Sequence, residues 1–314
     1  MMKRVVLIVG LVVCVGISSA VVQVLPAVAV GVAKGNPDTM RVMLAAEATV
    51  GNAAAKHERI VRYRVGRGDA FYGILIGKHI RRLTNSFVEI AQGRRDFAGA
   101  GDALDKVQLL APVNPSKVIC FGWTFPSHAR EVGGEERRKE PLVFLKPPTV
   151  IIADKGTIVL PGKLSSQVEF EGELAAVIGK RLRNVTPEQA LKGVLGFTCM
   201  NDVTARDLTK KDPEFTRGKG FDTFGPLGPW IVTRLDPGDL SIQTFLNGQI
   251  RQDARTSEMT FDVPFLISYI SQVMTLLPGD VIAFGTPGGS GKLKPGDKIQ
   301  VKIENIGLLT NFVK

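Results

Sequence analysis

The chain has 314 residues, 44% of them hydrophobic and 22% charged, which is enough for one large or two modest globular domains. This apolar content excludes a disordered chain, and 34 Gly and 18 Pro without a period exclude a collagen-like or low-complexity one. Three cysteines exclude a disulfide scaffold. The net charge of +10 is compatible with nucleic acid, anionic lipid or an acidic small substrate as a partner.

Residues 1–33 are predicted to be a signal peptide or a membrane anchor. Lys3 and Arg4 form a basic start, and residues 5–33 contain no charged residue and no histidine. About 20 such residues cross a bilayer as a helix, so we expect an apolar helix here, in contact with the membrane unless it is removed. The basic start would keep the N-terminus in the cytoplasm and export the body, while Ala27-Val28-Ala29 has the form of a signal-peptidase site.

Two alternatives to export stay open at this point. The apolar segment can also be a buried core helix, or the protein can be cytoplasmic and start at Met40 or Met43. Residues 34–57 are predicted to be a linker, because Gly35-Asn36-Pro37-Asp38 interrupts any helix. Residues 1–57 hold five of the 40 Lys and Arg and two of the 30 Asp and Glu, so most of the positive charge lies on the remaining body.

The body is predicted to consist of a small β unit over residues 58–114 and a larger β-rich domain over 115–314. Residues 59–75 alternate between apolar and polar around Gly66 and Gly68, which predicts a hairpin. Short apolar runs predict further strands at residues 117–121, 174–178, 230–233, 281–284 and 299–303. Helix signals are few: Thr186 and Pro187 form a start signal for a helix near 186–191, and residues 263–274 are another candidate. The fold class is therefore mostly β (α+β).

A group of acidic residues carries the most informative chemistry. Residues 168–174 alternate strictly, so a strand here would place Glu169, Glu171 and Glu173 on one face. An exposed edge strand with salt bridges is one interpretation. The other is a buried cluster, because residues 174–178 continue as an apolar run, and buried carboxylates need a cation. Asp202 follows another apolar run, and oxygen ligands favour Mg, Mn or Ca over Zn or Cu.

His128 is the one histidine whose neighbours point to catalysis. If residues 127–131 form a helical turn, Glu131 lies one turn after His128 and can orient its imidazole. Such a pair can deprotonate water near neutral pH, although most pairs of this kind are surface decoration.

Two glycine-rich stretches have the composition of functional loops. Residues 285–292 do not form a phosphate-binding loop, because Thr286 and Leu293 stand where the motif needs Gly and Ser or Thr. Residues 218–220 are interpreted as a loop that presents Lys219. No nucleic-acid-binding motif is recognisable and only 7% of residues are aromatic, so nucleic acid is not an expected partner.

Short motifs in the body follow one another in a specific order. They are His128-x-x-Glu131, Phe144-Leu145-Lys146-Pro147, Glu169-Phe170-Glu171-Gly172-Glu173-Leu174, Asn201-Asp202-Val203-Thr204-Ala205-Arg206-Asp207-Leu208, Lys219-Gly220-Phe221-Asp222 and Gly285-Thr286-Pro287. In this order the chain resembles the fumarylacetoacetate hydrolase family, in its bacterial-type branch of acylpyruvases, fumarylpyruvate hydrolases and 2-hydroxyhepta-2,4-diene-1,7-dioate isomerases. The resemblance runs from about residue 59 to the C-terminus and is strongest over residues 115–309.

The resemblance implies a mixed β-sandwich or β-roll core with a small N-terminal β unit, usually in a homodimer. It implies that Glu171, Glu173 and Asp202 bind Mg or Mn, with Ca also possible, and that Glu169 is a nearby acidic residue. It further implies roles for the remaining site residues: His128 and Glu131 activate water, Lys219 holds developing negative charge, and Arg206, Thr286 and Lys146 contact a small anionic 2-oxo acid.

Some positions depart from the family pattern. Thr124 and Phe125 replace a more usual Asn-Tyr pair, and Thr209 stands where Gln is frequent. These changes affect the expected substrate pocket and leave the metal ligands intact, so they bear on substrate identity. The membrane-directed N-terminal segment is also unusual for the family.

The reaction expected from the resemblance is hydrolysis of a C–C bond in a 2,4-dioxo acid of the acylpyruvate or fumarylpyruvate type, with a metal stabilising the enolate. One alternative is isomerisation, tautomerisation or decarboxylation of a 2-oxo or 2-hydroxy-diene dicarboxylate, which needs no water positioned by His128. Another is a membrane-tethered binding protein without turnover, for which Thr124 and Phe125 are the argument.

Overall fold

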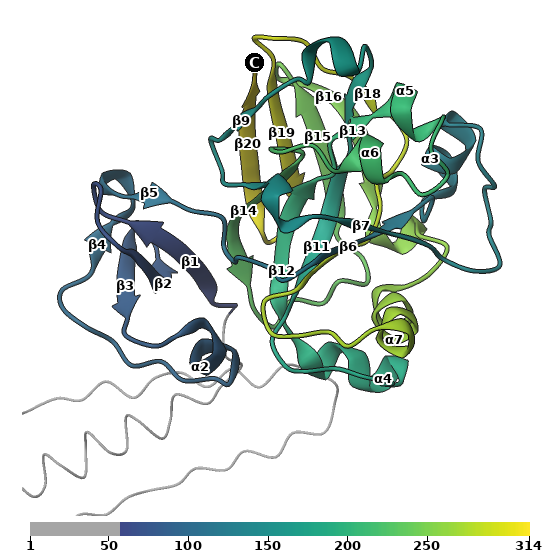
Figure 1. Cartoon of the computed structure of the whole chain (residues 1–314). Helices are drawn as coiled ribbons and strands as arrows, with labels where there is room; N and C mark the ends of the chain where they lie inside the picture. The colour runs from purple at the N-terminus through teal and green to yellow at the C-terminus, as the bar shows by residue number, and fades with distance from the viewer. Residues whose placement is uncertain (1–56) are drawn as a thin grey trace, which may run out of the picture. The chain divides into compact units, whose positions relative to one another are not determined.

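The computed structural model describes residues 57–314, and these residues are mostly β with few short helices (Figure 1). The predicted mostly β (α+β) class is thus confirmed for this part of the chain. The predicted signal peptide or anchor, its apolar helix and nearly all of the linker lie outside the described residues. Within residues 57–314, none of the helices has the length and apolar character needed to cross a membrane.

The N-terminal part of the body is a small antiparallel sheet. It contains β1 (Arg59–Arg64), β2 (Ala70–Ile76), β3 (His79–Leu83) and β4 (Asp102–Ala103) in this spatial order, with β5 (Gln108–Leu109) also paired to β1. The predicted hairpin is confirmed, because β1 and β2 pair in antiparallel register. In the sequence, helix α2 (Phe87–Ala91) follows β3 and precedes β4. At residues 59 and 60, β1 also pairs with β14 of the core, so the small sheet continues into the large one.

The core of the large sheet runs in the order β14, β12, β11, β17, β6, β7. Its strands are β6 (Val118–Gly122), β7 (Leu142–Lys146), β11 (Gly172–Ile178), β12 (Val194–Asn201), β14 (Gly225–Val232) and β17 (Val281–Ala283), with β8 (Ile151–Ile152) paired to β14. The strands predicted near residues 117–121, 174–178, 230–233 and 281–284 correspond to β6, β11, the end of β14 and β17. Strand β11 is central, because β12 and β17 pair with its two edges.

Two smaller sheets complete the fold. One has five strands, β16 (Gln249–Arg255), β15 (Ser241–Leu246), β19 (Lys298–Ile303), β20 (Gly307–Val313) and β9 (Thr157–Ile158). The other has three, β13 (Thr204–Ala205), β10 (Val168–Phe170) and β18 (Gly291–Lys292). Most pairs are antiparallel, but β6 with β17, β8 with β14 and β9 with β20 are parallel, so the sheets are mixed.

The alternation of side chains along β11 explains where the hydrophobic core lies. Leu174 and Ala176 face a cluster that contains Ile242 and Val301 of the five-stranded sheet. Their neighbours Ala175 and Val177 belong to a second cluster on the opposite face. Because both faces of β11 are covered, its residues are apolar almost without interruption, as expected of a fully buried strand.

The helices are short and lie outside the sheets. They include α3 (Pro126–Glu131), α4 (Pro187–Ala190), α5 (Arg206–Thr209), α6 (Thr216–Lys219) and α7 (Val263–Val273). The two predicted helices correspond to α4 and α7, and α3 contains the predicted helical turn. The expectation of a loop around Lys219 is wrong, because this residue ends α6. Gly218 allows that turn to pack closely, since a Cβ there would lie 2.4 Å from a methyl carbon of Thr209.

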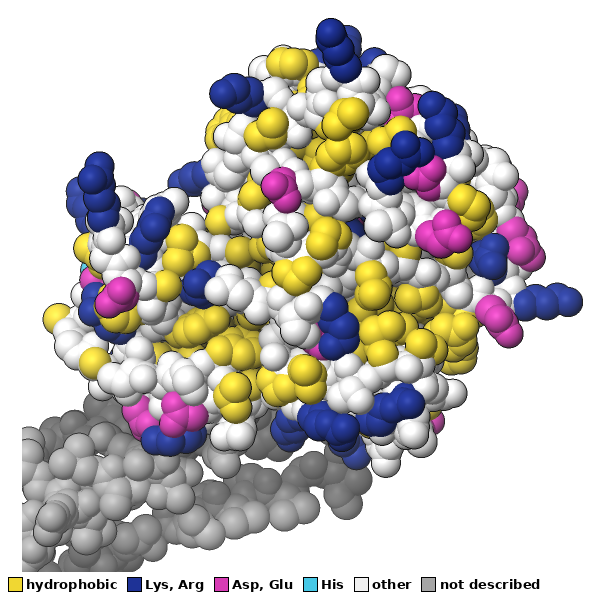
Figure 2. All heavy atoms as spheres, in the orientation of Figure 1, with side chains coloured by type: hydrophobic (Ala, Val, Ile, Leu, Met, Phe, Trp, Pro, Cys, Tyr) yellow, Lys and Arg dark blue, Asp and Glu magenta, His cyan; other side chains and the backbone are white. Residues whose placement is uncertain are grey.

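The face of the molecule shown in Figure 2 carries Lys and Arg side chains spread among Asp, Glu and separate hydrophobic patches. Residues 58–314 hold more basic than acidic side chains, and on this face the basic side chains do not form one continuous patch.

The close approach of β12 to β14 gives a test of this fold. A Cβ on Gly196 would lie 2.4 Å from the carbonyl oxygen of Val232, which is backbone and cannot rotate away. Gly196→Ala should therefore lower the free energy of unfolding by about 1–3 kcal/mol, measured by urea denaturation. Gly238→Ala is the control, because Gly238 is exposed and its added Cβ would meet only a side-chain oxygen at 3.2 Å. Equal stability of the two variants would contradict this packing.

Candidate metal centre and active site

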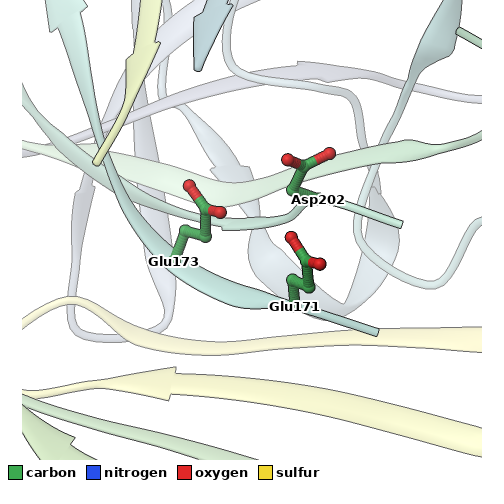
Figure 3. Close-up of side chains that lie close together, drawn as sticks. All are labelled: Glu171, Glu173 and Asp202. Atoms are coloured by element: carbon green, nitrogen blue, oxygen red, sulfur yellow. The ribbon is translucent and has the colours of Figure 1, made fainter. Parts of the chain in front are cut away.

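Three buried carboxylates converge at one end of β11 (Figure 3). Glu171 directly precedes β11, Glu173 is its second residue, and Asp202 directly follows β12. The antiparallel register places Gly172 opposite Asn201, which brings Asp202 next to Glu171. One oxygen of each carboxylate lies within 4.8 Å of the others, and the residues are 3%, 1% and 0% exposed.

This burial decides between the two interpretations of the acidic stretch. The edge-strand interpretation is wrong, because β11 lies in the middle of the large sheet. The expected continuous strand is also interrupted: Glu171 falls between β10 and β11. Glu169 therefore belongs to the three-stranded sheet, where it accepts hydrogen bonds from Gln167 and Arg206, and it lies outside the converging group.

Three basic side chains compensate this buried negative charge. The Lys219 ammonium lies 2.7 Å from both Glu171 Oε2 and Asp202 Oδ2. Lys146 Nζ lies 2.5 Å from Asp202 Oδ1 and also donates to the carbonyl of Val203. Arg206 pairs with Glu169 through Nε, at 2.8 Å, and with Glu171 through Nη2.

Glu173 is the carboxylate of the cluster that pairs with none of these three cations. It forms no ion pair with any residue of the described chain, and it accepts a hydrogen bond from the backbone N–H of Gly285 at 2.8 Å. Burial, with Asp202 and Glu171 close by, raises the pKa of Glu173 well above its usual value. Burial also acts to raise the pKa of Glu171, but Lys219 and Arg206 outweigh it and hold that pKa well below its usual value.

The residues fit a hard divalent cation. Every candidate ligand atom is a carboxylate oxygen, the donor type that Mg, Mn and Ca prefer and that soft metals do not select. Glu173 has no ion-pair partner among the described residues, and its pKa is raised mainly by burial, with Asp202 and Glu171 adding to the effect. A dication held by Glu171, Glu173 and Asp202 would give the ionised form of Glu173 a positive partner.

His128 lies beside this cluster and is held in one orientation. Its Nδ1 is 3.1 Å from Glu131 Oε2, on the same turn of α3. Glu131 in turn accepts hydrogen bonds from the Gly289 N–H and the Ser290 hydroxyl. Burial acts to raise the pKa of Glu131, but these hydrogen bonds and the one from His128 lower it overall. An ionised carboxylate can only accept, so the Nδ1 of His128 carries a proton toward Glu131, and in the neutral imidazole Nε2 is then the nitrogen with the lone pair.

The cluster opens into a cavity of about 250 Å³. His128 Nε2 lies 3.7 Å from Glu171 Oε1, and both residues line the cavity. Of the residues predicted at the site, the cavity is lined by His128, Glu171, Glu173, Arg206, Lys219 and Thr286. Lys146 does not line it; this residue is buried, and its ammonium donates to Asp202 and to the carbonyl of Val203. Its predicted role in substrate binding stays a prediction.

The peptide between the two glutamates is anchored on both sides. The N–H of Gly172 donates to Gln252 Oε1 at 3.0 Å, and its carbonyl accepts from the Thr286 hydroxyl at 2.9 Å. The Gln252 side-chain amide then donates to the same hydroxyl, at 2.8 Å. Thr286, predicted as a substrate contact, thus also positions the ligand-bearing backbone. The role of Gln252 was missed, because it lies 80 residues along the chain on β16 and no local signal connects it to Gly172.

The positions that depart from the family pattern are all buried. The Thr124 hydroxyl donates to the carbonyl of Phe284, and Phe125, which directly precedes α3, is fully buried in the core. Neither lines the cavity, whereas Thr209 does. The sequence did not indicate that aromatic residues form one wall of the cavity, namely Trp123, Phe144 and Phe215.

Comparison with known proteins gives one family. Residues 117–314 match the model of the fumarylacetoacetate (FAA) hydrolase C-terminal domain. The chain is 41% identical over 263 residues to the oxaloacetate tautomerase YisK of Bacillus subtilis, covering 79% of this chain and 84% of that protein.

Solved structures agree with this match. The crystal structure of a 2-hydroxyhepta-2,4-diene-1,7-dioate isomerase from Mycobacterium marinum is similar with a TM-score of 0.74 and 42% identity, covering 82% of this chain and 98% of that one. A fumarylacetoacetate hydrolase from Exiguobacterium antarcticum is similar with a TM-score of 0.73 and 38% identity, covering 82% and 99%.

The metal centre can be tested by titrating chelator-treated protein with Mn²⁺ in a calorimeter. We expect one bound ion per chain, and we expect Asp202→Asn to weaken binding by more than about 100-fold, since changes outside the ligand shell alone cost 10–100-fold. Asp207→Asn is the matched control, because Asp207 lies on α5 and its carboxylate accepts hydrogen bonds from the Ser165 and Ser166 hydroxyls. Equal Mn²⁺ affinity in both variants would show that the cluster does not bind the ion.

The backbone anchor can be tested in the same titration. Gln252→Leu should weaken Mn²⁺ binding by about 10–100-fold, because it frees the peptide that carries Glu171 and Glu173. Gln300→Leu removes a similar hydrogen bond to a threonine, Thr310, on the same sheet and should leave Mn²⁺ affinity unchanged. If both variants lost stability alike and neither lost affinity, the anchor would be structural only.

Proposed function

The chain belongs to the fumarylacetoacetate hydrolase family, and on that premise we propose that it is a divalent-metal-dependent enzyme that interconverts the keto and enol forms of a small 2-oxo acid. The observation that carries this proposal is the position of His128. His128 lines the cavity with its Nε2 3.7 Å from Glu171, and the hydrogen bond between its Nδ1 and Glu131 leaves Nε2 as the nitrogen that can accept a proton in the neutral imidazole.

The residues of the site divide the chemistry among them. A metal ion held by Glu171, Glu173 and Asp202 would polarise the carbonyl of the 2-oxo acid and stabilise the negative charge of its enolate. Arg206 and Lys219 line the cavity and add positive charge at the same end, which favours an anionic substrate. Within the described residues, Nη1 of Arg206 makes no hydrogen bond, so it is available to a substrate carboxylate.

His128 would move the proton. As a base, Nε2 takes a proton from the carbon next to the carbonyl, and the resulting imidazolium is stabilised by Glu131 on one side and Glu171 on the other. The same nitrogen then delivers the proton to the enolate oxygen, which gives the enol, and the reverse reaction moves the proton from that oxygen back to the carbon. Support for this reaction also comes from relatives: YisK is named an oxaloacetate tautomerase and the Mycobacterium marinum protein an isomerase.

A second candidate function is hydrolysis of a C–C bond in a 2,4-dioxo acid, the reaction first expected from the sequence. The His128–Glu131 pair favours it as well, because the same Nε2 can deprotonate a water molecule. Products separate the two candidates: a tautomerase leaves the carbon skeleton of an acylpyruvate intact, whereas a hydrolase releases pyruvate and a second acid. Mass spectrometry of the reaction mixture distinguishes them directly.

The proposal predicts a large effect at His128. With Mg²⁺ or Mn²⁺ and the enol forms of several 2-oxo acids, His128→Gln should lower kcat by at least about 100-fold, measured as the loss of enol absorbance above the uncatalysed rate. His79→Gln is the control, because His79 is an exposed residue at the start of β3. Full activity of His128→Gln on every substrate would contradict both candidate reactions, and full activity after chelation would contradict the metal.

A further inference from the structure

The residues that line the cavity fall into two chemical groups. One is polar and contains the carboxylates together with His128, Arg206, Lys219 and Thr286. The other, here called the aromatic wall, consists of Trp123, Val132, Phe144 and Phe215. The two groups meet where the Lys219 ammonium lies 4.9 Å from the centroid of the Phe144 ring. A substrate whose 2-oxo acid head lies at the carboxylates therefore has the aromatic wall within reach of its remaining atoms.

Two rings of the aromatic wall are held by unusual backbone. Trp123 has φ 55° and Phe215 has φ 61°, in the left-handed region that bulky residues avoid. Such backbone is energetically unfavourable and persists where the surrounding structure imposes it, frequently at ligand sites. The two ring centroids lie 6.4 Å from each other, although the residues are far apart in the sequence.

Further contacts fix both rings in place. Phe215 meets Phe144 edge to face, with centroids 5.7 Å apart. The Trp123 ring is packed so closely against Gly134 that a Cβ there would lie 2.8 Å from it, and the guanidinium of Arg138 lies 5.6 Å from its centroid. The aromatic wall is therefore a preorganised surface, and a rigid apolar surface binds flat apolar groups at low entropic cost.

The polar groups near this wall are already occupied or lie in solvent. The Thr124 hydroxyl, which follows Trp123 in the chain, donates to Phe284 and not to the cavity. Lys210 lines the cavity but is exposed, so an ion pair with a substrate would be weak. A second carboxylate placed against the aromatic wall would lose water without gaining buried partners, which is unfavourable.

We propose that this site selects a 2-oxo acid whose substituent beyond the carbonyl is flat and apolar, such as an aryl group, over one that carries a second carboxylate there. The aromatic wall, and Trp123 in particular, determines this specificity. The inference rests on the proposed function, because it assumes that the 2-oxo acid head binds at the carboxylate cluster.

The test compares three probes that share the 2-oxo acid head: phenylpyruvate, oxaloacetate and pyruvate. Calorimetry on the Mn²⁺-loaded protein gives the Kd of each, and the enol assay gives kcat/KM for phenylpyruvate and oxaloacetate. We expect phenylpyruvate to bind at least about 10-fold more tightly than pyruvate and oxaloacetate, and to have the higher kcat/KM.

Variants at Trp123 identify the residue responsible. Trp123→Gly removes the ring and suits the left-handed backbone, so it should fold normally and keep its Mn²⁺ affinity. It should lower the affinity and kcat/KM for phenylpyruvate by about 10-fold or more and change those for oxaloacetate by less than about 3-fold. Phe265→Ala, a half-exposed aromatic on α7, is the control and should change neither.

The inference is overturned if oxaloacetate binds as tightly as phenylpyruvate, or if Trp123→Gly weakens both probes equally. It is also overturned if the unmodified protein prefers oxaloacetate to phenylpyruvate and Lys210→Met weakens oxaloacetate binding about 10-fold. The second carboxylate would then be the recognised group. Because binding is measured apart from turnover, a protein that binds phenylpyruvate through Trp123 without enolising it would contradict the proposed function alone.

Discussion

The burial of several carboxylates on the central strands of the large sheet is the constraint on which the rest of the site depends. Buried carboxylates are stable only when cations or hydrogen-bond donors compensate them. Here Lys146, Arg206 and Lys219 come from three separate elements to provide that compensation, and their positions fix β7, α5 and α6 around the cluster. Glu173 remains without a cation among the described residues, so a bound metal ion would give it the partner that it lacks.

This constraint also explains why the backbone is held so firmly. A metal ligand is effective only when its carboxylate cannot turn away, so the strand that carries it must be rigid. The hydrogen bonds of Gln252 and Thr286 to Gly172, and of Asn201 to the N–H of Glu171, anchor the chain at both glutamates. The same rigid frame then presents His128 and the aromatic wall at defined distances, which links the core packing to the choice of substrate.

Features that depend on neighbouring residues were predictable from the sequence. The β1–β2 hairpin, the buried strand β11 and the turn that joins His128 to Glu131 follow from periodicity over a few positions, and the structure has all three. The grouping of Glu171, Glu173 and Asp202 was implied by the family resemblance, and their closeness follows from the pairing of β11 with β12.

Features that depend on distant contacts were not predictable. The strand was expected to continue through Glu171, but the chain changes sheets there, because β10 pairs with β13 and β18. The sequence predicts a loop around Lys219, because the two flanking glycines hide a short helix that packs on α5. The aromatic wall brings together Trp123 and Phe215 from separate elements, so no local pattern reveals it.

Diffraction from crystals grown with Mn²⁺, at a wavelength where manganese scatters anomalously, tests the central claim most directly. The account predicts one strong anomalous peak per chain, in contact with carboxylate oxygens of Glu171, Glu173 and Asp202. A peak at another place in the molecule, or no peak while Lys219 still bridges Glu171 and Asp202, would contradict it.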